Sequence, residues 1–429
     1  MIVEFRVKNF RSFREEQTLS LVASRDGTLP DNCVSKGRLR FLKAAAVYGA
    51  NASGKSNLIR AVATMKGIVL DSAEYKPGQK LEVMPFLLDA ESGKEPSVFE
   101  MVFYVEGVRY QYGFAATSKR IEEEWLAAYP KGSAQNWFER KFNEKRHEYD
   151  WKYSTFFRGN KVALAEKTRE NALFLSVGAQ WNNEQLRVVY EWFRTKLQVL
   201  SSRRMLHPVT AKMLLPPERP AGTEGNLRHT ITRILQEADL GINNVAVRKK
   251  EIDMDVMTWP TDLPDEVRSK LTRLIEEEEG IEVDVLHENA ETGKEVHIPL
   301  NEESDGTQVF FKLIGPWLYA LRFGITILID EIESSLHPLL TRQLVHIIQG
   351  LRIDNKEGAQ LIFATHDTTL LDPELLRRDQ IWFTEKDKNG GTRLCPLSDY
   401  RPRKGEAIQK GYLSGRYGGV PILERFSIE

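Results

Sequence analysis

The clearest candidates for a functional site form a glycine-rich loop, Gly49-Ala50-Asn51-Ala52-Ser53-Gly54-Lys55-Ser56. This run fits the pattern G-x-x-x-x-G-K-[ST] in full. Its glycines let the backbone curl so that N–H groups point at a β-phosphate, at the positive end of the helix that follows. Lys55 would reach the β- and γ-phosphates, and the Ser56 hydroxyl would ligate Mg²⁺. The expected nucleotide contacts are Gly49, Asn51, Ala52, Ser53, Gly54, Lys55, Ser56 and Asn57.

Two adjacent carboxylates form a second candidate group. The apolar run Ile325–Ile329 predicts a buried strand that ends at Asp330 and Glu331. Asp330 would hold Mg²⁺, directly or through water, and Glu331 would polarise an attacking water as general base. Two solvated acids at a strand end are the alternative, which a complete phosphate-binding loop in the same chain disfavours.

A histidine follows the next apolar run. His366 comes directly after residues 361–365, at the carboxyl end of a predicted strand, where α/β sheets bind ligands. We therefore expect it to contact a γ-phosphate, although a lone histidine is more often structural. Glu333 and His337 stand at i,i+4 and could suggest a metal pair, but no third ligand is apparent.

The secondary structure expected around these residues follows from apolar periodicity. A strand, the loop and a helix are expected in that order around residues 42–65, and antiparallel strands around residues 81–130. The Gly315-Pro316 pair should kink its helix. The other expected elements are a strand at 2–7, mainly helical structure at 160–280 with one helix at 225–238, a helix at 307–322, a strand at 325–329, a helix at 338–351 and a strand at 360–365.

The domain organisation follows from this order. We expect an α/β fold in which a P-loop nucleotide-binding domain has its halves at the two chain ends. Residues 1–160 would form the first half with an antiparallel β lobe. Residues 161–295 would form a mainly helical insertion, and residues 296–429 the second half with a tail.

Composition excludes several classes of protein. The 429 residues are 41% hydrophobic and 28% charged, and the formal net charge of -1 does not indicate nucleic acid as a partner. Local basic clusters exist at residues 203–204, 248–250 and 401–404. Two cysteines form no disulfide framework. No apolar run of about 18 residues predicts a membrane span, and no signal peptide is evident, so a reduced cytoplasmic setting is expected.

The order of these motifs resembles the ABC/SMC/RecF ATPases. The resemblance implies ATP and Mg²⁺ as ligands, Ser334–Pro338 as the D-loop and His366 as the switch histidine. It also implies a signature motif that meets the partner's γ-phosphate, for which Glu303-Ser304-Asp305-Gly306-Thr307 is the candidate. This run departs from L-S-G-G-Q, but Ser304, the Gly306 backbone and the helix N-terminus can still meet phosphate. Hydrolysis would then require a homodimer.

Two further nucleotide contacts follow from the same resemblance. Gln180 comes after the apolar run 173–177, where SMC-like proteins place a glutamine after a strand, and Gln111 is the competing candidate. Arg11 lies in the run Asn9–Phe13, which looks like the strand and loop with which RecF and SMC proteins begin.

The whole chain is similar to stand-alone bacterial ATPases of anti-phage and abortive-infection operons, such as the ATPase subunit of RloA/RloB-type systems. The family-specific piece is the tail Tyr412–Pro421, which could dock a partner or cap the domain. The resemblance implies an ATPase sensor or clamp with a separate effector, expected to be a nuclease. The alternative is a RecF-like ATPase that engages DNA directly. A transporter subunit fits poorly, and a purely structural nucleotide-binding module is disfavoured by Glu331 and His366.

Overall fold

The chain divides into two compact units. The computed structural model describes residues 1–37, 39–201, 209–215, 224–249, 280–351, 358–403 and 405–420. The first unit comprises Met1–Leu200, Ala320–Ile332 and Val345–Glu429. The second unit comprises Ser201–Tyr319 and Glu333–Leu344.

A six-stranded sheet carries the predicted nucleotide-binding elements of the first unit, in the order β11-β15-β16-β5-β17-β18. The neighbours β15, β16, β5 and β17 run parallel, and β18 pairs with β17 in the antiparallel direction. β16 therefore lies between the strand of the phosphate-binding loop and the strand of the two carboxylates. The strands are β5 (Ala44–Gly49), β11 (Leu197–Ser201), β15 (Thr326–Asp330), β16 (Gln360–Ala364), β17 (Ile381–Lys386) and β18 (Thr392–Pro396).

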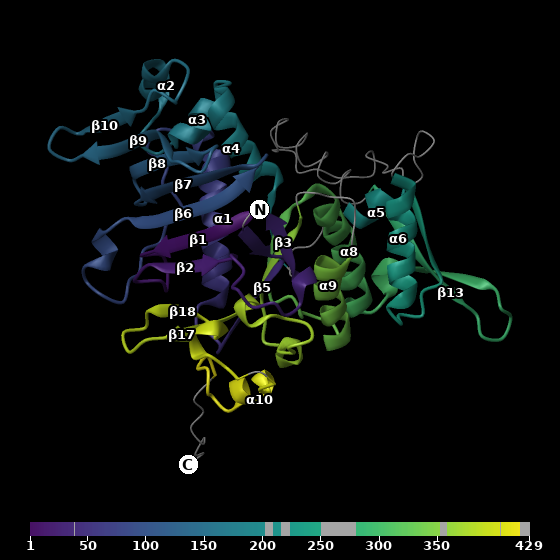
Figure 1. Cartoon of the computed structure of the whole chain (residues 1–429). Helices are drawn as coiled ribbons and strands as arrows, with labels where there is room; N and C mark the ends of the chain where they lie inside the picture. The colour runs from purple at the N-terminus through teal and green to yellow at the C-terminus, as the bar shows by residue number, and fades with distance from the viewer. Residues whose placement is uncertain are drawn as a thin grey trace, which may run out of the picture. The chain divides into compact units, whose positions relative to one another are not determined.

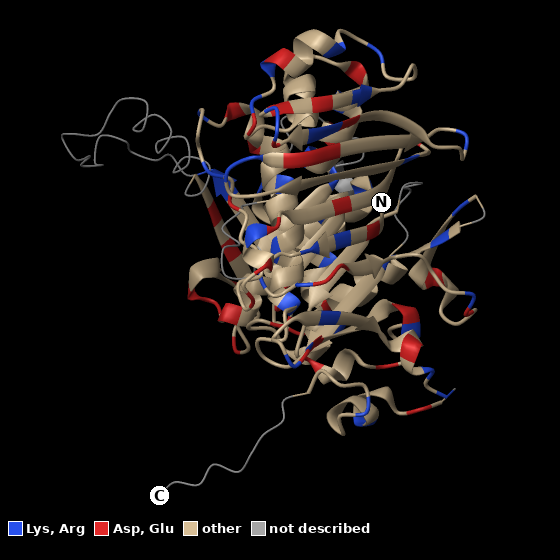
Figure 2. Ribbon diagram, turned by 90° about the vertical axis from the view of Figure 1, so that its left-hand side faces the viewer, with Lys and Arg blue, Asp and Glu red and all other residues tan. Residues whose placement is uncertain are grey.

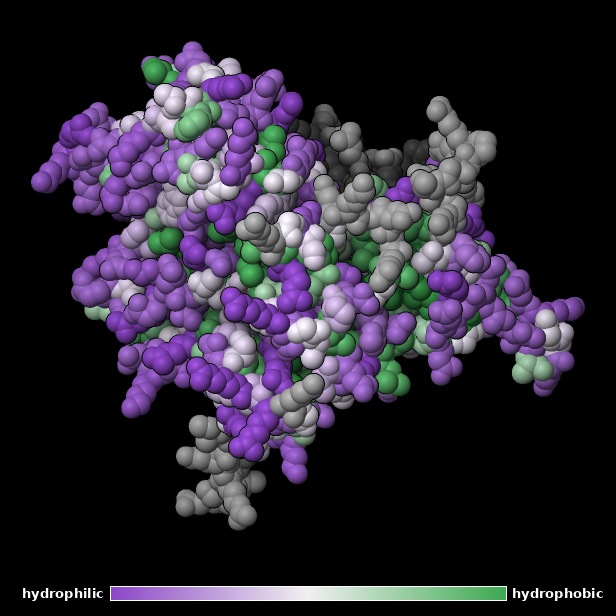
Figure 3. Space-filling view, viewed as in Figure 1, coloured by the Kyte–Doolittle hydropathy of each residue, from purple (hydrophilic) through white to green (hydrophobic). Residues whose placement is uncertain are grey.

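A seven-stranded antiparallel sheet forms the second layer of this unit, in the order β10-β9-β8-β7-β6-β1-β2 (Figure 1). Residues alternate between exposed and half-buried along its edge strand β10, and the surface of this sheet seen in Figure 3 is mostly hydrophilic. The predicted N-terminal antiparallel lobe is confirmed, although residues 81–96 form no strand and β6 begins only at Ser97. The strands are β1 (Ile2–Lys8), β2 (Gln17–Ser20), β6 (Ser97–Val105), β7 (Val108–Ala116), β8 (Ile121–Tyr129), β9 (Gln135–Asn143) and β10 (Glu148–Tyr153). A separate hairpin pairs β3 (Cys33–Lys36) with β4 (Leu39–Leu42).

Helix α1 (Lys55–Asp71) shares one hydrophobic core with both sheets. Its apolar residues Leu58, Val62 and Met65 are buried in a cluster that includes strand residues of each sheet, such as Val47 and Phe103. These helix residues recur every three or four positions, as the sequence pattern predicted. The core therefore fixes the start of α1, and with it the loop that precedes this helix.

The boundary of the insertion differs from the predicted one at residue 161. The helices α2 (Lys161–Lys167), α3 (Phe174–Gln180) and α4 (Glu184–Thr195) belong to the first unit. Their apolar side chains, including Phe174, Leu186 and Phe193, lie in the core of that unit. Helical periodicity marked these elements, but it could not show which core they join.

A buried ion pair joins two strands of the antiparallel sheet in the first unit. Arg140 of β9 and Glu124 of β8 are fully buried, with 2.9 Å between Nη2 and Oε2. Glu124 also accepts hydrogen bonds from the backbone N–H groups of Phe174 and Leu175, at 2.8 and 3.0 Å, where α3 begins. A carboxylate at a helix N-terminus is favourable, so this pair ties α3 to the sheet.

The described part of the second unit combines helices with a small sheet. Its three-stranded antiparallel sheet has the order β12-β13-β14, and α6 packs against β12. Ile231 and Leu235 of α6 and Val285 of β13 are buried. The elements are α5 (Val209–Leu214), α6 (Glu224–Glu237), β12 (Asn244–Lys249), β13 (Ile281–Glu288) and β14 (Glu295–Pro299), with most of α8 (Asp305–Phe323) and the start of α9 (Pro338–Gly350).

The Gly315-Pro316 pair lies inside α8, which continues through it. Proline has no N–H for the carbonyl four residues before it. The Thr210 hydroxyl lies 3.3 Å from that carbonyl, of Lys312, and accepts a hydrogen bond from the Gly315 N–H at 3.0 Å. A side chain at position 315 would overlap Thr210. The Thr210 hydroxyl thus compensates for the missing helix hydrogen bond at the point where the sequence predicted a kink.

Within the described part of the chain, the helices are too short or too polar for any to be a candidate membrane span.

Candidate functional site

The phosphate-binding loop (Gly49–Ser56) connects the end of β5 to the start of α1, as predicted. Ala52 and Gly54 have positive φ, 61° and 119°, which gives the loop its tight curl. Because α1 begins at Lys55, the unpaired N–H groups of its first turn face the loop. The Lys55 side chain is buried, and its Nζ donates to the carbonyls of Gly49 and Ala50 at 2.8 and 3.2 Å. The lysine therefore lies over the concave side of the loop, where a phosphate would replace these carbonyls as its partner.

The hairpin of β17 and β18 supports this loop. The Ser53 hydroxyl lies 2.6 Å from the Thr384 hydroxyl, and Thr392 donates to the Ser53 carbonyl at 2.8 Å. A side chain at Gly49 would come within 2.7 Å of the Thr384 carbonyl, and one at Gly54 would overlap Thr392. Neither threonine could be identified from the sequence, because no motif marks a residue that touches the loop from a distant strand.

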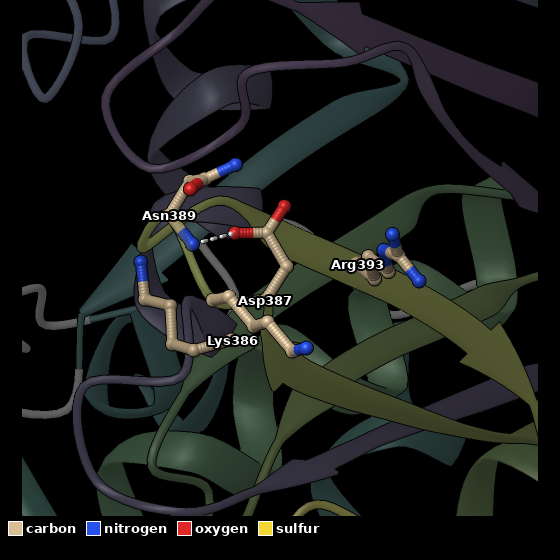
Figure 4. A pocket seen from close by; sticks show the side chains of 5 residues that line it. Lys386, Asp387, Asn389 and Arg393 are labelled. Carbon is tan, nitrogen blue, oxygen red and sulfur yellow. Dashed lines mark hydrogen bonds between the residues drawn. The ribbon is translucent and has the colours of Figure 1, made fainter.

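The turn of the same hairpin carries a hollow of about 350 Å³, lined by Lys386, Asp387, Lys388, Asn389 and Arg393 (Figure 4). Asp387 accepts hydrogen bonds from the backbone N–H groups of Asn389 and Gly391, both at 2.8 Å. These bonds lower the pKa of the Asp387 carboxyl. The carboxylate therefore stabilises the turn that leads into Thr392.

The N-terminal loop also reaches the phosphate-binding loop. Asn57 donates through its amide to the Ser12 hydroxyl at 2.8 Å, and the Thr392 N–H donates to the Ser12 carbonyl at 2.7 Å. The neighbouring Arg11 is exposed, has a φ of 51°, and donates its own N–H to the Met84 carbonyl. The structure thus places Arg11 next to Ser12, which contacts Asn57 and Thr392 beside the phosphate-binding loop, and its nucleotide contact stays a prediction.

The two predicted acids lie at the end of β15. Asp330 closes the strand, and its Oδ1 is buried without a hydrogen-bond partner. Such an atom costs free energy unless it gains a ligand. Glu331 follows with a φ of 53°, which turns the chain sharply away from the strand direction. Next, Ile332 donates its N–H to the Ala364 carbonyl of β16 at 3.2 Å.

The residues present fit a magnesium ion. Mg²⁺ usually takes one or two protein oxygens, with waters and substrate phosphates completing its shell. Asp330 Oδ1 and the Ser56 hydroxyl are such oxygens. Among the described residues, no three or more His, Cys, Asp or Glu side chains gather as a metal cluster, so the Glu333 and His337 pair gains no third ligand.

His366 is exposed just beyond the end of β16, the strand between β5 and β15. The next residue, Asp367, accepts the Tyr48 hydroxyl at its carbonyl, at 3.0 Å. The Asp367 Oδ1 accepts the Thr369 N–H, while its Oδ2 is buried without a partner. Since neighbouring parallel strands end at one edge of a sheet, the loop, the two acids and His366 share this edge.

Gln180 does not join this group. The run before it forms the helix α3 instead of the expected strand, and Gln180 is its last, exposed residue. Ser176 of this helix donates to the Val69 carbonyl at 2.6 Å, near the far end of α1. At 1.5 Å per residue, that point lies about 20 Å along α1 from the loop. An apolar run of five residues cannot distinguish a strand from a buried helix, and this is why the prediction was wrong. Gln111 instead bonds Glu100 and Tyr129 within the antiparallel sheet.

The predicted signature segment lies in the second unit. The Ser304 hydroxyl accepts the Thr307 N–H at 3.2 Å and so caps the N-terminus of α8. A side chain at Gly306 would approach the Ser335 carbonyl of the predicted D-loop within 2.9 Å. His287 and Glu303 lie 2.7 Å apart and attach this segment to β13. The segment therefore begins α8 with a capped N-terminus and lies next to the predicted D-loop.

The predicted basic clusters are described only in part. Arg248 pairs with Glu282 at 2.6 Å and with Asp284 at 3.4 Å. Residues 203–204, 250 and 404 lie outside the described residues. The ribbon in Figure 2 shows acidic and basic residues interspersed along the strands of the first unit.

Comparisons with known proteins identify a family for this chain. A family model described as "AAA domain, putative AbiEii toxin, Type IV TA system" matches residues 44–207 and 217–372, which is more than half of the chain. No curated protein sequence matches. Among solved structures, the SMC head domain from Thermotoga maritima is 12% identical and covers 92% of this chain and 98% of its own, with a TM-score of 0.40. The protein cbiO1 from Clostridium perfringens, part of the ABC transporter complex cbiONQ, is 11% identical, covers 98% of each chain and has a TM-score of 0.28.

Proposed function

Since the chain belongs to this AAA domain family, we propose that it binds ATP with Mg²⁺ and hydrolyses it with Glu331 as general base. The observation that carries the proposal is the shared edge of three strands. β5 leads into the phosphate-binding loop, β15 ends in Asp330 with its unpartnered Oδ1, and β16 ends before His366.

Each residue has a separate task in this proposal. The loop N–H groups and Lys55 hold the β- and γ-phosphates, and Lys55 exchanges its carbonyl partners for phosphate oxygens. Ser56 and Asp330 hold Mg²⁺, which neutralises charge that develops on the phosphates. Glu331 takes a proton from the attacking water, and His366 contacts the γ-phosphate. The positive φ of Glu331 directs its side chain separately from that of Asp330.

We further propose that hydrolysis needs two copies of the chain. The signature segment around Ser304 and Gly306 begins α8, and a helix N-terminus suits an anion. In a homodimer, each copy would present this segment to the γ-phosphate held by the other. The resemblance to the ABC/SMC/RecF ATPases supports this arrangement.

The biological role that we propose is an ATPase sensor or clamp in anti-phage defence, acting in the cytoplasm with a separate effector, expected to be a nuclease. The family description, which names a putative AbiEii toxin and a Type IV TA system, supports this role. So does the resemblance of the tail to RloA/RloB-type ATPases. A RecF-like role on DNA is the second candidate, and the pairing of Arg248 with acids weighs against it.

The experiment that tests the proposal is steady-state ATP turnover by the purified chain, with Mg²⁺ or EDTA and with or without double-stranded DNA at physiological salt. Glu331→Gln should lower turnover by about a hundredfold or more, the range for loss of a general base, and should accumulate ATP-bound dimer in light scattering. Glu333→Gln, two residues away, is the matched control and should retain turnover. Unchanged turnover in Glu331→Gln would remove the assigned base. Strong stimulation by DNA would favour the RecF-like role.

A further inference from the structure

The tail lies against the first glycine of the phosphate-binding loop. An added Cβ at Gly419 would come within 3.4 Å of the Gly49 Cα and 3.5 Å of the Thr384 carbonyl. Gly419 has a φ of 66°, which favours glycine, and its N–H donates to the Glu385 carboxylate at 2.9 Å. The tail therefore packs onto the loop and β17 at the place where β5 ends. Figure 1 shows α10 (Ile408–Leu413) and the residues after it beside β17.

Tyr412 holds the tail glycine through its hydroxyl. This hydroxyl donates to the Gly419 carbonyl at 3.1 Å. Burial raises the pKa of Tyr412. One buried hydroxyl thus holds the glycine that packs on the first residue of the loop.

A layer of aromatic rings holds Tyr412 in place. Its ring stacks on Phe383 of β17 with 5.4 Å between centroids and meets Tyr48 of β5 edge to face at 5.7 Å. Tyr417 is fully buried on Phe383, with a centroid distance of 5.8 Å. Such pairs contribute beyond the area that they bury. The rings therefore fix the tail to β5 and β17, the strands beside the loop.

We propose that Tyr412 is a positioning residue for the phosphate-binding loop, and that the tail is part of the nucleotide site. The hydroxyl holds Gly419 against the Gly49 backbone where the loop leaves β5, and this packing restricts the direction in which the following N–H groups point. This inference rests on the proposed binding of ATP. Of the two roles considered for the tail, docking a partner or capping the domain, it favours a local role at the loop.

Linkage makes the relation reciprocal. If the tail helps the loop to bind ATP, bound ATP must stabilise the docked tail by the same factor. The backbone N–H groups of residues 408–419 should therefore exchange more slowly with solvent when the nucleotide is bound.

The test measures Mg·ADP binding by titration calorimetry for the wild-type chain, Tyr412→Phe and Tyr400→Phe. Tyr400 belongs to the same ring cluster, 6.1 Å from Phe383 and 5.6 Å from Tyr417 between centroids. It loses the same atom in the variant but contacts neither Gly49 nor Gly419 in the described structure. We expect Tyr412→Phe to weaken binding by about three- to tenfold, the range for one buried hydrogen bond, and Tyr400→Phe to bind like the wild type.

Hydrogen exchange separates positioning from a merely structural role. In the wild type, Mg·ADP should slow exchange in residues 408–419, and in Tyr412→Phe this nucleotide-dependent protection should shrink although the protein stays folded. Equal affinity of all three proteins, or no protection of the tail in a wild type that binds ADP, would overturn the inference. A wild type that binds no nucleotide would instead overturn the proposed function.

Discussion

The hydroxyl of Thr392 donates to the carbonyl of Ser53 at 2.8 Å, although 339 positions separate the two residues in the chain. It also lies 2.8 Å from the Ser12 hydroxyl, which the Asn57 amide contacts. One side chain near the C-terminus thus connects the N-terminal loop, the phosphate-binding loop and the first turn of α1. Residues outside the sequence motif therefore help to hold the phosphate-binding loop.

Replacing Thr392 by valine should therefore loosen the phosphate-binding loop. The change keeps the shape of the side chain but leaves the buried Ser53 carbonyl without its donor, which costs about 1–3 kcal/mol. We expect a lower free energy of unfolding in urea and weaker ATP binding. Thr392→Ser retains the hydroxyl and is the control. If Thr392→Val matched Thr392→Ser in both measurements, the contact would have no role in supporting the loop.

Gly49→Ala should abolish nucleotide binding for a steric reason. The added methyl would lie 2.7 Å from the Thr384 carbonyl and would also overlap the hydroxyls of Thr384 and Ser53. Side-chain hydroxyls can be removed by mutation, but a backbone carbonyl cannot. Gly49→Ala combined with Thr384→Ala should therefore remain as defective in an ATP-binding assay as Gly49→Ala alone. Recovery of binding in the double variant would assign the conflict to the Thr384 side chain.

Much of the first unit could be predicted because its signals are local. The apolar runs before Gly49 and Asp330 form β5 and β15, and the helical spacing after Ser56 forms α1. The insertion boundary could not be predicted, because α2 to α4 are helical in pattern but join the core of the first unit. Periodicity reports which face of a helix is buried and not what buries it.

The candidate site divides in the same way. The placement of the glycine-rich loop between β5 and α1, and of Asp330 and Glu331 at the end of β15, could be predicted, because phosphate and metal chemistry restrict those residue types and their spacing. The support from Thr384 and Thr392, and from the tail that Tyr412 holds, could not, since it depends on tertiary packing that no sequence spacing encodes. Gln180 shows the opposite failure: the resemblance implied a glutamine after a strand, but residues 174–180 form the helix α3.

The buried pair of Arg140 and Glu124 should matter for stability and not for chemistry. Both side chains have no exposed surface, and Glu124 holds the start of α3. Arg140→Met would leave a buried carboxylate without its cation, at a cost of about 3–5 kcal/mol. Arg146→Met is the matched control, because the pair of Arg146 with Asp150 is about half exposed and should contribute less than about 1 kcal/mol. Equal urea midpoints for the two variants would contradict this assignment.

Asp330→Asn should separate metal binding from nucleotide binding. The carboxylate is expected to hold Mg²⁺ through the Oδ1 that has no protein partner, whereas the loop N–H groups and Lys55 hold phosphates without it. In the wild type, ATP affinity should fall when EDTA removes Mg²⁺. In Asp330→Asn, affinity in Mg²⁺ should resemble that of the wild type in EDTA, and adding EDTA should change it little. An amide is close to the size of a carboxylate, so a large loss of folding stability is not expected and can be checked by urea unfolding. If the variant still responded to Mg²⁺ as strongly as the wild type, the ion would have to be held by other groups.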